Sequence, residues 1–391
     1  MHETLCADQK ARPELTTHRR DPWPTVRMNV AQEFDPLFHA ALALNLSGET
    51  AEAALITITR TTGSTFRRAG ASMLVHQDGR LVCELSGGCP QRDIVLRSQQ
   101  AMACDEPAVI NYGRESNFDV MLETGCGGEL EVLIEPWRRP DDIAFLYAIE
   151  ELRSRRTQGA MASLFTADGG LASERPRRLV HGGGKTWTNI GRSTVERQIL
   201  STLLSAGTST AAVAQQVELE GHRRDVLLEY LQPPHALVVI GDGIGASALV
   251  QLSMQLGWRT TLVNPSSATE VAHAGARFMS ATPDMLLSSV PLDSLTSVVV
   301  MTHRLDRDIA YVNAVVKSSA NYIGVIGSRS RAQAILSALP GEEARVHAPA
   351  GLDVGSETPQ EIALAIAAEI LAVRNKRMGG PLVHSRNAIH P

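Results

Sequence analysis

The chain of 391 residues is 43% hydrophobic and 20% charged, which is typical of a globular protein with two or three domains. Its net charge of -5 and its aromatic content of 4% argue against nucleic acid as a partner, and no apolar run is long enough to span a membrane. Five cysteines without CxxC spacing favour free thiols in a reducing cytoplasm over a disulfide framework or a zinc site.

The first predicted elements follow a polar N-terminal stretch. We expect residues 1–30 to be a disordered extension without a secretory signal, because they lack an apolar segment. A helix is predicted at 34–46 and a strand at 54–59, before a glycine- and serine-rich loop that carries Arg67 and Arg68. The guanidinium fork matches phosphate geometry, so Arg67 is a candidate phosphate ligand, although such arginines are more often only solvated.

A β-hairpin with an Asp-Gly turn is predicted at 71–85, and it leads into Ser86-Gly87-Gly88-Cys89. Gly87 and Gly88 permit positive φ angles, so that successive N–H groups can form an anion-binding nest to which the next helix adds its positive end. We expect this setting to lower the pKa of Cys89, which is then a candidate metal ligand. The alternative is a tight turn with a small buried thiol.

A second glycine–cysteine turn lies further along the chain. Apolar residues at helical spacing predict a helix through 94–102, and a strand follows at 109–112. The chain then passes through a Gly-Cys-Gly-Gly sequence that contains Cys126 and Gly127, before an alternating strand at 129–135. Cys126 and Gly127 are therefore further candidate cofactor ligands, with Cys126 as a second thiol for a metal.

The middle of the chain carries weaker patterns. A charged helix is predicted at 141–158, followed by a strand–turn–strand pattern over 162–180 that faintly echoes the earlier hairpin. Residues 181–185 look like a phosphate loop but lack the GxxxxGK[ST] spacing, so a solvated linker loop is expected there. A short strand is predicted at 226–230, and the Gln-Pro-Pro sequence at 232–234 marks a domain boundary.

A dinucleotide-type motif begins after this boundary. The continuous apolar strand at 236–240 is of the buried parallel type and runs into Gly241, Gly243 and Ala246, the key positions of G-x-G-x-x-A. A helix and a second strand follow and complete a βαβ unit. Gly241 and Gly243 are candidate cofactor ligands, because the strand–turn–helix context is the one this motif requires.

Two positions qualify the nucleotide interpretation. The second strand ends in Asn264, where an acidic residue usually binds the ribose, so binding of NAD or NADP is disfavoured. A further strand at 298–301 leads to His303, at a carboxyl end where ligands bind in open parallel sheets. His303 is a candidate base or ligand, oriented by Asp306 or Asp308, and the alternative is a helix cap or a loop hydrogen-bonder.

The last predicted elements include another anion site. A strand at 322–326 leads into a helix that Ser328 can cap, and Arg329 can reach over the positive end of that helix. Ser328 and Arg329 are therefore candidate cofactor ligands. A short strand at 346–349 follows, and a capping box at 358–361 starts a final structural helix.

Together these elements predict an α/β protein. It has a C-terminal Rossmann-like, doubly wound parallel sheet and an N-terminal α+β domain rich in β-hairpins. The expected boundaries are an extension at 1–30, the α+β domain at 31–234, the Rossmann-like domain at 235–375 and a tail at 376–391.

The chain resembles the xanthine dehydrogenase accessory protein family (XdhC/CoxI), which serves molybdenum hydroxylases. The resemblance covers roughly residues 35–391, and its motifs are specific in combination where each alone is not. The stretches that carry it are residues 63–70, 86–89, 125–129, 301–303, 324–329 and 347–355.

This resemblance implies a protein that binds the molybdenum cofactor, protects it while a sulfur is added to the metal, and inserts it into an apo molybdenum hydroxylase. The cofactor would be molybdopterin or its cytosine dinucleotide form, and a cysteine desulfurase-type protein would donate the sulfur. The glycine-rich nests suit the anionic phosphate, and Cys89 or Cys126 suits the thiophilic metal. Such a protein is a cofactor-insertion factor rather than an enzyme, located in the cytoplasm, and the class suggests a homodimer.

Two other functions stay open at this point. The Rossmann half is also compatible with an NAD(P)-dependent oxidoreductase in which His303 donates or accepts a proton. The third possibility is an assembly factor that binds only proteins and whose cysteines are simply buried.

Overall fold

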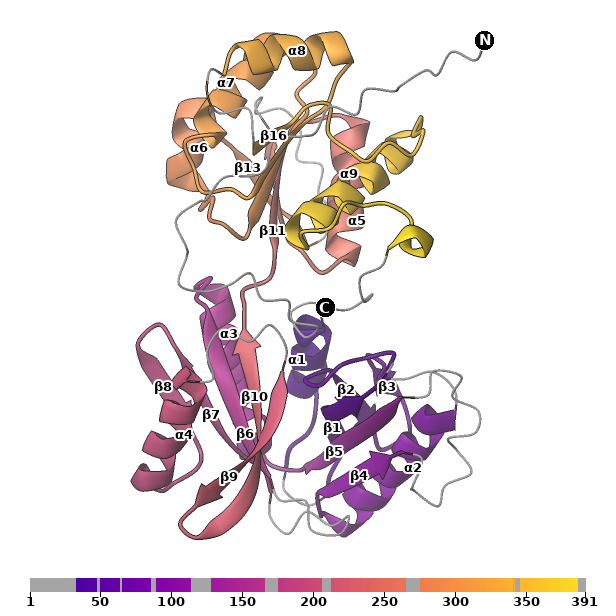
Figure 1. The fold of residues 1–391 in the computed structure, drawn as a ribbon, viewed down its shortest axis with the longest axis vertical. Coiled ribbons are helices and arrows are strands. Elements are labelled where there is room, and N and C mark those ends of the chain that lie inside the picture. Colours follow the sequence, from indigo (N-terminus) through magenta and orange to yellow (C-terminus); the bar gives the residue numbers. More distant parts are fainter. Residues whose placement is uncertain are drawn as a thin grey trace, which may run out of the picture.

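The computed structural model describes residues 33–47, 50–63, 65–85, 89–113, 128–165, 175–205, 212–264, 275–339, 341 and 345–385. These residues form two antiparallel five-stranded sheets and one parallel six-stranded sheet (Figure 1). The α/β class is confirmed, with a β-hairpin-rich N-terminal region and a C-terminal Rossmann sheet. None of the described helices is long and apolar enough to cross a bilayer.

The first sheet has the strand order β3-β2-β1-β5-β4. Successive side chains of its central strands point to opposite faces of the sheet. Apolar residues occupy both faces and pack against α1 on one side and α2 on the other. The Asp-Gly turn of the predicted hairpin is confirmed, with Gly79 at a φ of 85°. The elements are α1 Phe34–Leu42, β1 Ala53–Thr62, β2 Ser72–His76, β3 Leu81–Val82, α2 Cys89–Cys104, β4 Ala108–Tyr112 and β5 Glu129–Trp137.

The second sheet has the strand order β8-β7-β6-β10-β9. The predicted linker loop at 181–185 is wrong, because Gly183 and Gly184 form a tight turn with φ angles of 56° and 75° between two paired strands. The predicted helix at 141–158 is shorter, since Arg156 is left-handed and ends it. The elements are a 3-10 turn Pro140–Ile143, α3 Ala144–Ser154, β6 Gly159–Phe165, β7 Arg177–Gly182, β8 Lys185–Thr188, α4 Ser193–Ser205, β9 Val213–Leu219 and β10 His222–Leu231.

The two antiparallel sheets are built by the same sequence of elements. Each begins with a helix, continues with three antiparallel strands, crosses over through a second helix and returns with two strands, the last of which pairs with the first. The faint echo between the two hairpins in the sequence is therefore part of a full structural repeat. We call these units repeat 1 (residues 34–137) and repeat 2 (residues 144–231).

The third sheet has the strand order β13-β12-β11-β14-β15-β16, and all its neighbours are parallel. Helices α5 and α9 pack on one face, and α6, α7 and α8 cover the other, as a doubly wound sheet requires. The elements are β11 Ala236–Ile240, α5 Ile244–Gln255, β12 Arg259–Asn264, β13 Arg277–Ser280, α6 Pro283–Ser289, β14 Thr296–Val300, α7 Leu305–Val315, β15 Tyr322–Val325, α8 Arg329–Ser337, β16 Val346–His347, α9 Pro359–Arg374 and a 3-10 turn Leu382–His384.

The third sheet meets the repeats along the amino ends of its strands. Arg156, just after α3, binds Asp293 before β14 with both donor–acceptor distances at 2.7 Å. Arg259, the first residue of β12, lies 3.4 Å from the carboxylate of Asp35 in α1. The carboxyl ends of the strands, which we call the carboxyl edge, therefore lie on the side of the sheet away from the repeats (Figure 1).

Candidate functional site

The glycine turn after β11 is packed tightly against the neighbouring strand β14. A Cβ on Gly241 would lie 2.5 Å from the carbonyl oxygen of Met301, so only glycine fits there. Gly243 is the N-cap of α5, and a Cβ on it would lie 2.9 Å from Nε2 of His303. Ala246 is buried, as the third position of the motif requires. The turn thus leaves backbone N–H groups at the positive end of α5.

His303 lies against this turn in an unusual backbone conformation. Its φ is 60°, which is rare for a non-glycine residue, and its side chain is exposed. The helix-cap alternative is excluded because Arg304 is the N-cap of α7. The expected pairing with an acidic neighbour is also wrong: Asp306 binds Arg304 at 2.8 Å, and Asp308 has other partners.

Asp308 is a buried carboxylate that joins two strand ends, a role that the sequence did not indicate. One of its oxygens accepts from the Thr302 hydroxyl at 2.6 Å and from the Thr302 N–H at 3.1 Å. Its other oxygen accepts from Nη2 of Arg331 in α8 at 2.5 Å. Asp308 therefore holds the loop that carries His303 against the start of α8.

The start of α8 forms the second anion-site candidate at this edge. Ser328 caps the helix as predicted, its hydroxyl accepting from the N–H of Arg331 at 3.3 Å. Arg329 is the first helical residue and is exposed. Since β14 and β15 are neighbours, His303 and Ser328 follow adjacent strands of the sheet. Asn264 ends β12 on the other side of the glycine turn and is buried.

A hydrogen-bonded network fixes the end of the sheet next to β15. The carboxylate of Glu369 in α9 accepts from the Tyr322 hydroxyl at 2.6 Å and the Gly351 N–H at 2.8 Å, and it contacts Nδ1 of His347 at 3.1 Å. Burial favours a higher pKa for Glu369, but these bonds hold its pKa below the usual value. The ring of His347 stacks on that of Tyr322 at 4.5 Å. The network shapes the segment that follows β16.

Arg67 is engaged inside repeat 1 rather than open to an anion. Its two terminal nitrogens bind the carboxylate of Glu33 at 2.5 and 2.6 Å, and it also donates to the carbonyl of Glu84 at 3.2 Å. The neighbouring thiol of Cys83 is partly buried, and burial, with Glu33 nearby, raises its pKa to about 11. Arg67 therefore ties the stretch before α1 to the end of the hairpin, and Cys83 is an unreactive thiol.

The two glycine–cysteine turns fall largely outside the described residues. Gly87, Gly88, Cys126 and Gly127 lie there, and Cys89 is described only as the first residue of α2. Within the described ranges, no three His, Cys, Asp or Glu side chains are grouped closely enough to hold a metal ion. The thiol site therefore stays a prediction.

Described residues around the turns nevertheless fix where the chain enters and leaves them. The Tyr112 hydroxyl at the end of β4 donates to Asp93 in the second turn of α2 at 2.7 Å. The connection that contains Cys126 leaves β4 just beyond Tyr112 and returns at Gly128, immediately before β5. Both ends of this connection thus lie at the end of repeat 1 where α2 begins.

Comparison with known proteins gives consistent matches over most of the chain. Residues 237–370 match the XdhC Rossmann domain, and residues 47–113 match the XdhC and CoxI family. A Bacillus subtilis protein described as a probable xanthine dehydrogenase subunit is 25% identical over 344 residues, which are 87% of this chain and 98% of that protein. The molybdenum cofactor insertion chaperone PaoD of Escherichia coli is 23% identical over 331 residues, which are 82% of this chain and 83% of PaoD.

A solved structure shares the fold. A crystal structure of a xanthine dehydrogenase from Bacillus halodurans superimposes with a TM-score of 0.70 over 91% of this chain and 98% of that one. The two sequences are 19% identical, so the likeness extends to the fold alone.

Proposed function

The chain belongs to the XdhC and CoxI family, and we propose that it binds a molybdenum cofactor and inserts it into a molybdenum hydroxylase of the xanthine dehydrogenase type. The cofactor is cargo in this role, so the chain has to bind, shield and release it. The named relatives support the role, and the residues below are our assignment to it.

The observation that carries the proposal is a pair of anion sites at the carboxyl edge, one after β11 and one after β15, on either side of β14. The glycine turn leads into α5, whose N-cap is Gly243, and His303 lies directly beside Gly243. Ser328 and Arg329 begin α8 after β15. Phosphate and pyrophosphate bind at helix N-termini of this kind. We assign the phosphate group of the cofactor, plain or cytosine dinucleotide, to this edge.

We assign the metal to the thiols of Cys89 and Cys126, with Gly87, Gly88 and Gly127 supplying the surrounding N–H groups. Thiolates are the ligands that suit a thiophilic metal. The contact between Tyr112 and Asp93 supports this pairing, because it brings the ends of both cysteine-bearing segments to one end of repeat 1. Arg67 then acts through its contacts with Glu33 and Glu84, by holding the hairpin that leads to Cys89.

The two regions require separate tests. The carboxyl edge lies on the side of the third sheet away from the repeats, whereas α2 packs on the first sheet, within repeat 1 (Figure 1). One small cofactor would not reach both regions of a single chain in this arrangement. A homodimer, or a transfer from one region to the other, would reconcile them, and a cysteine desulfurase-type sulfur donor would meet the thiol region.

The thiol assignment predicts how much metal the purified protein retains. After incubation with molybdenum cofactor and gel filtration, wild-type protein should hold molybdenum and pterin in near-stoichiometric amounts. Cys89→Ser and Cys126→Ser should each lose at least half of the molybdenum, because one thiolate is removed. Cys104→Ser is the matched control, since Cys104 is an exposed thiol at the far end of α2. Full retention by both variants would refute the thiol assignment.

Transfer to the partner provides the second readout. Loaded wild-type protein should activate an apo-hydroxylase, and His303→Ala should weaken pterin retention without changing the folded state. If NADH binds tightly while the pterin does not, the oxidoreductase alternative replaces this proposal. If neither ligand binds, the assembly-factor alternative does.

A further inference from the structure

The structural repeat allows buried residues of repeat 1 and repeat 2 to be compared position by position. In repeat 1, Thr57 pairs across the sheet with Ser72 on one side and Leu133 on the other. The equivalent trio in repeat 2 is Ser163, Arg178 and Leu227. Leu133 and Leu227 pack in one cluster, so the two sheets face each other through these equivalent strands.

The same registers make two buried glutamates equivalent. Leu55 lies two residues before Thr57 in repeat 1 and pairs with Glu135. Met161 lies two residues before Ser163 in repeat 2 and pairs with Glu229. Both carboxylates are 5% exposed. Glu135 and Glu229 therefore occupy the same place in the two repeats.

Among the described residues, a cation binds only one of these two glutamates. Arg178 of repeat 2 binds Glu135 of repeat 1, and its guanidinium lies 4.1 Å from the ring centre of Phe145. The equivalent of Arg178 in repeat 1 is Ser72, whose short side chain binds Thr57 at 2.9 Å. Glu229 consequently faces a serine where Glu135 faces an arginine.

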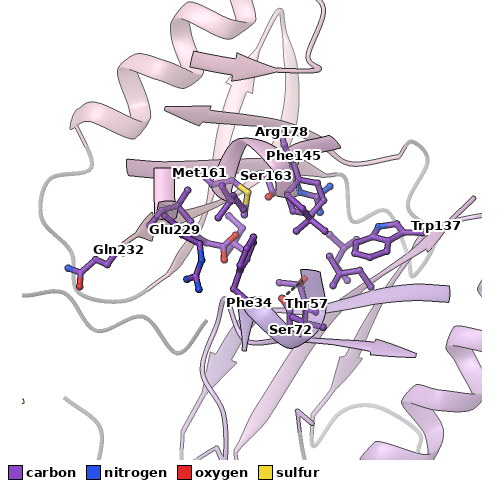
Figure 2. A pocket seen from close by; sticks show the side chains of 18 residues that line it. Phe34, Thr57, Ser72, Trp137, Phe145, Met161, Ser163, Arg178, Glu229 and Gln232 are labelled. Carbon is purple, nitrogen blue, oxygen red and sulfur yellow. Dashed lines mark hydrogen bonds between the residues drawn. The ribbon is translucent and has the colours of Figure 1, made fainter. Parts of the chain in front are cut away.

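A cavity lies between the two sheets, and both Ser72 and Glu229 line it. It has a volume of about 50 Å³, and Figure 2 shows side chains of both sheets around it, including those of Thr57, Ser72, Ser163 and Glu229. A Cβ on Gly70 would lie 3.2 Å from Oε1 of Glu229, which places the carboxyl beside the start of β2. The cavity thus combines the Glu229 carboxyl and three hydroxyls with largely apolar walls, and the side chains of Arg153, Arg178 and Gln232 also line it.

We propose that this intersheet cavity binds a small amidinium or guanidinium cation, which pairs with Glu229 as Arg178 pairs with Glu135. The volume is roughly three to five times the minimum for one water molecule, which suits four or five heavy atoms and excludes a bicyclic pterin. The site is therefore distinct from the cofactor site proposed above. The ligand would supply two parallel N–H donors to the carboxylate, the geometry in which such pairs are strongest.

The two arginines that line the cavity each bind a carboxylate other than Glu229. Arg178 binds Glu135, and Arg153 of α3 binds Asp35 at 3.0 Å. Burial raises the pKa of Glu229 to about 8. The positive charge of Arg178 opposes this rise, and the negative charge of Glu135 adds to it. At neutral pH the empty site therefore holds a protonated carboxyl, which must release its proton when a cation binds.

The proposal is tested by calorimetric titration of the full-length protein with acetamidinium chloride. Acetamide and sodium chloride, which match its shape and its ionic strength, are the controls. Wild-type protein should bind acetamidinium but neither control, with an affinity that rises about tenfold between pH 6 and 7 and levels off toward pH 8. Glu229→Gln should abolish binding, because it keeps the shape and removes the charge. Binding that persists in this variant, or that is absent from the wild type, would overturn the proposal.

A second variant tests the repeat argument without an added ligand. Ser72→Arg supplies the guanidinium from the chain itself, so it should raise the melting temperature and eliminate the response to acetamidinium. In the background of Glu229→Gln the same arginine should lower the melting temperature, since it would be buried without a counter-charge. Equal effects of Ser72→Arg in both backgrounds would contradict the proposed pairing.

Discussion

At the scale of single residues, the protonation of the buried Glu229 carboxyl couples folding to pH. Its equivalent, Glu135, is neutralised by Arg178, whereas Glu229 has no such partner among the described residues. Burial raises the pKa of Glu229 from an ordinary value of 4.5 to about 8. A carboxyl that is neutral when folded and ionised when unfolded makes stability depend on pH.

The sign of this dependence gives a prediction. Between pH 5 and 8 the folded state binds one proton more than the unfolded state at Glu229, so the free energy of unfolding should fall as pH rises, by up to about 1.4 kcal/mol per pH unit. Glu229→Gln should remove this slope, because glutamine does not titrate. Urea unfolding at pH 6, 7 and 8 measures both proteins. Parallel pH profiles for the two would show that Glu229 is not the group responsible.

Local motifs were predictable from the sequence, whereas partners distant in the chain were not. The glycine turn at Gly241 and the capping box at Thr358 are confirmed, because each depends on residues a few positions apart. The clamp between Asp308 and Arg331 joins residues 23 positions apart through the packing of two helices, and no short pattern specifies it. The same holds for Arg67, whose partner Glu33 is 34 positions away.

At the scale of elements, the structural repeat accounts for two elements that were not predicted from the sequence. The edge strand β9 was not predicted, since most of its side chains are exposed or half-buried and lack a clear alternation. Helix α4 was also missed, although Val195, Ile199 and Leu203 follow helical spacing and are buried. Matching repeat 2 with repeat 1 identifies β9 and α4 as the counterparts of β4 and α2.

The clamp between α7 and α8 supports a prediction at this scale. Asp308→Ala should lower the free energy of unfolding by about 3 kcal/mol, because it leaves Arg331 and the Thr302 N–H without their buried acceptor. Asp306→Ala is the matched control: its pair with Arg304 is exposed, so its removal should leave the free energy of unfolding almost unchanged. Chemical denaturation compares the two variants. An equal loss in both would mean that Asp308 does not hold the carboxyl edge together.

At the scale of the whole molecule, the described part of the repeats meets the third sheet at its amino edge, on the side away from the carboxyl edge. The contacts involve Arg156 with Asp293, Arg259 with Asp35, and the linker residue Pro234, whose carbonyl accepts from Arg156 at 3.2 Å. Burial opposes ionisation of Asp293, but the bonds from Arg156 hold its pKa below the ordinary value. Arg156 is therefore the residue that fixes the orientation of the Rossmann half.

The last prediction concerns this contact. Arg156→Ala should release the Rossmann half, at a cost of about 2 kcal/mol, because Asp293 loses its counter-charge and the Pro234 carbonyl loses the donor from Arg156. Cleavage by a non-specific protease within residues 232–235 should then become faster while both halves keep their secondary structure. Arg155→Ala is the control, since the neighbouring Arg155 forms only an exposed pair with Glu151. If the two variants are cut at the same rate, Arg156 does not fix the orientation of the Rossmann half.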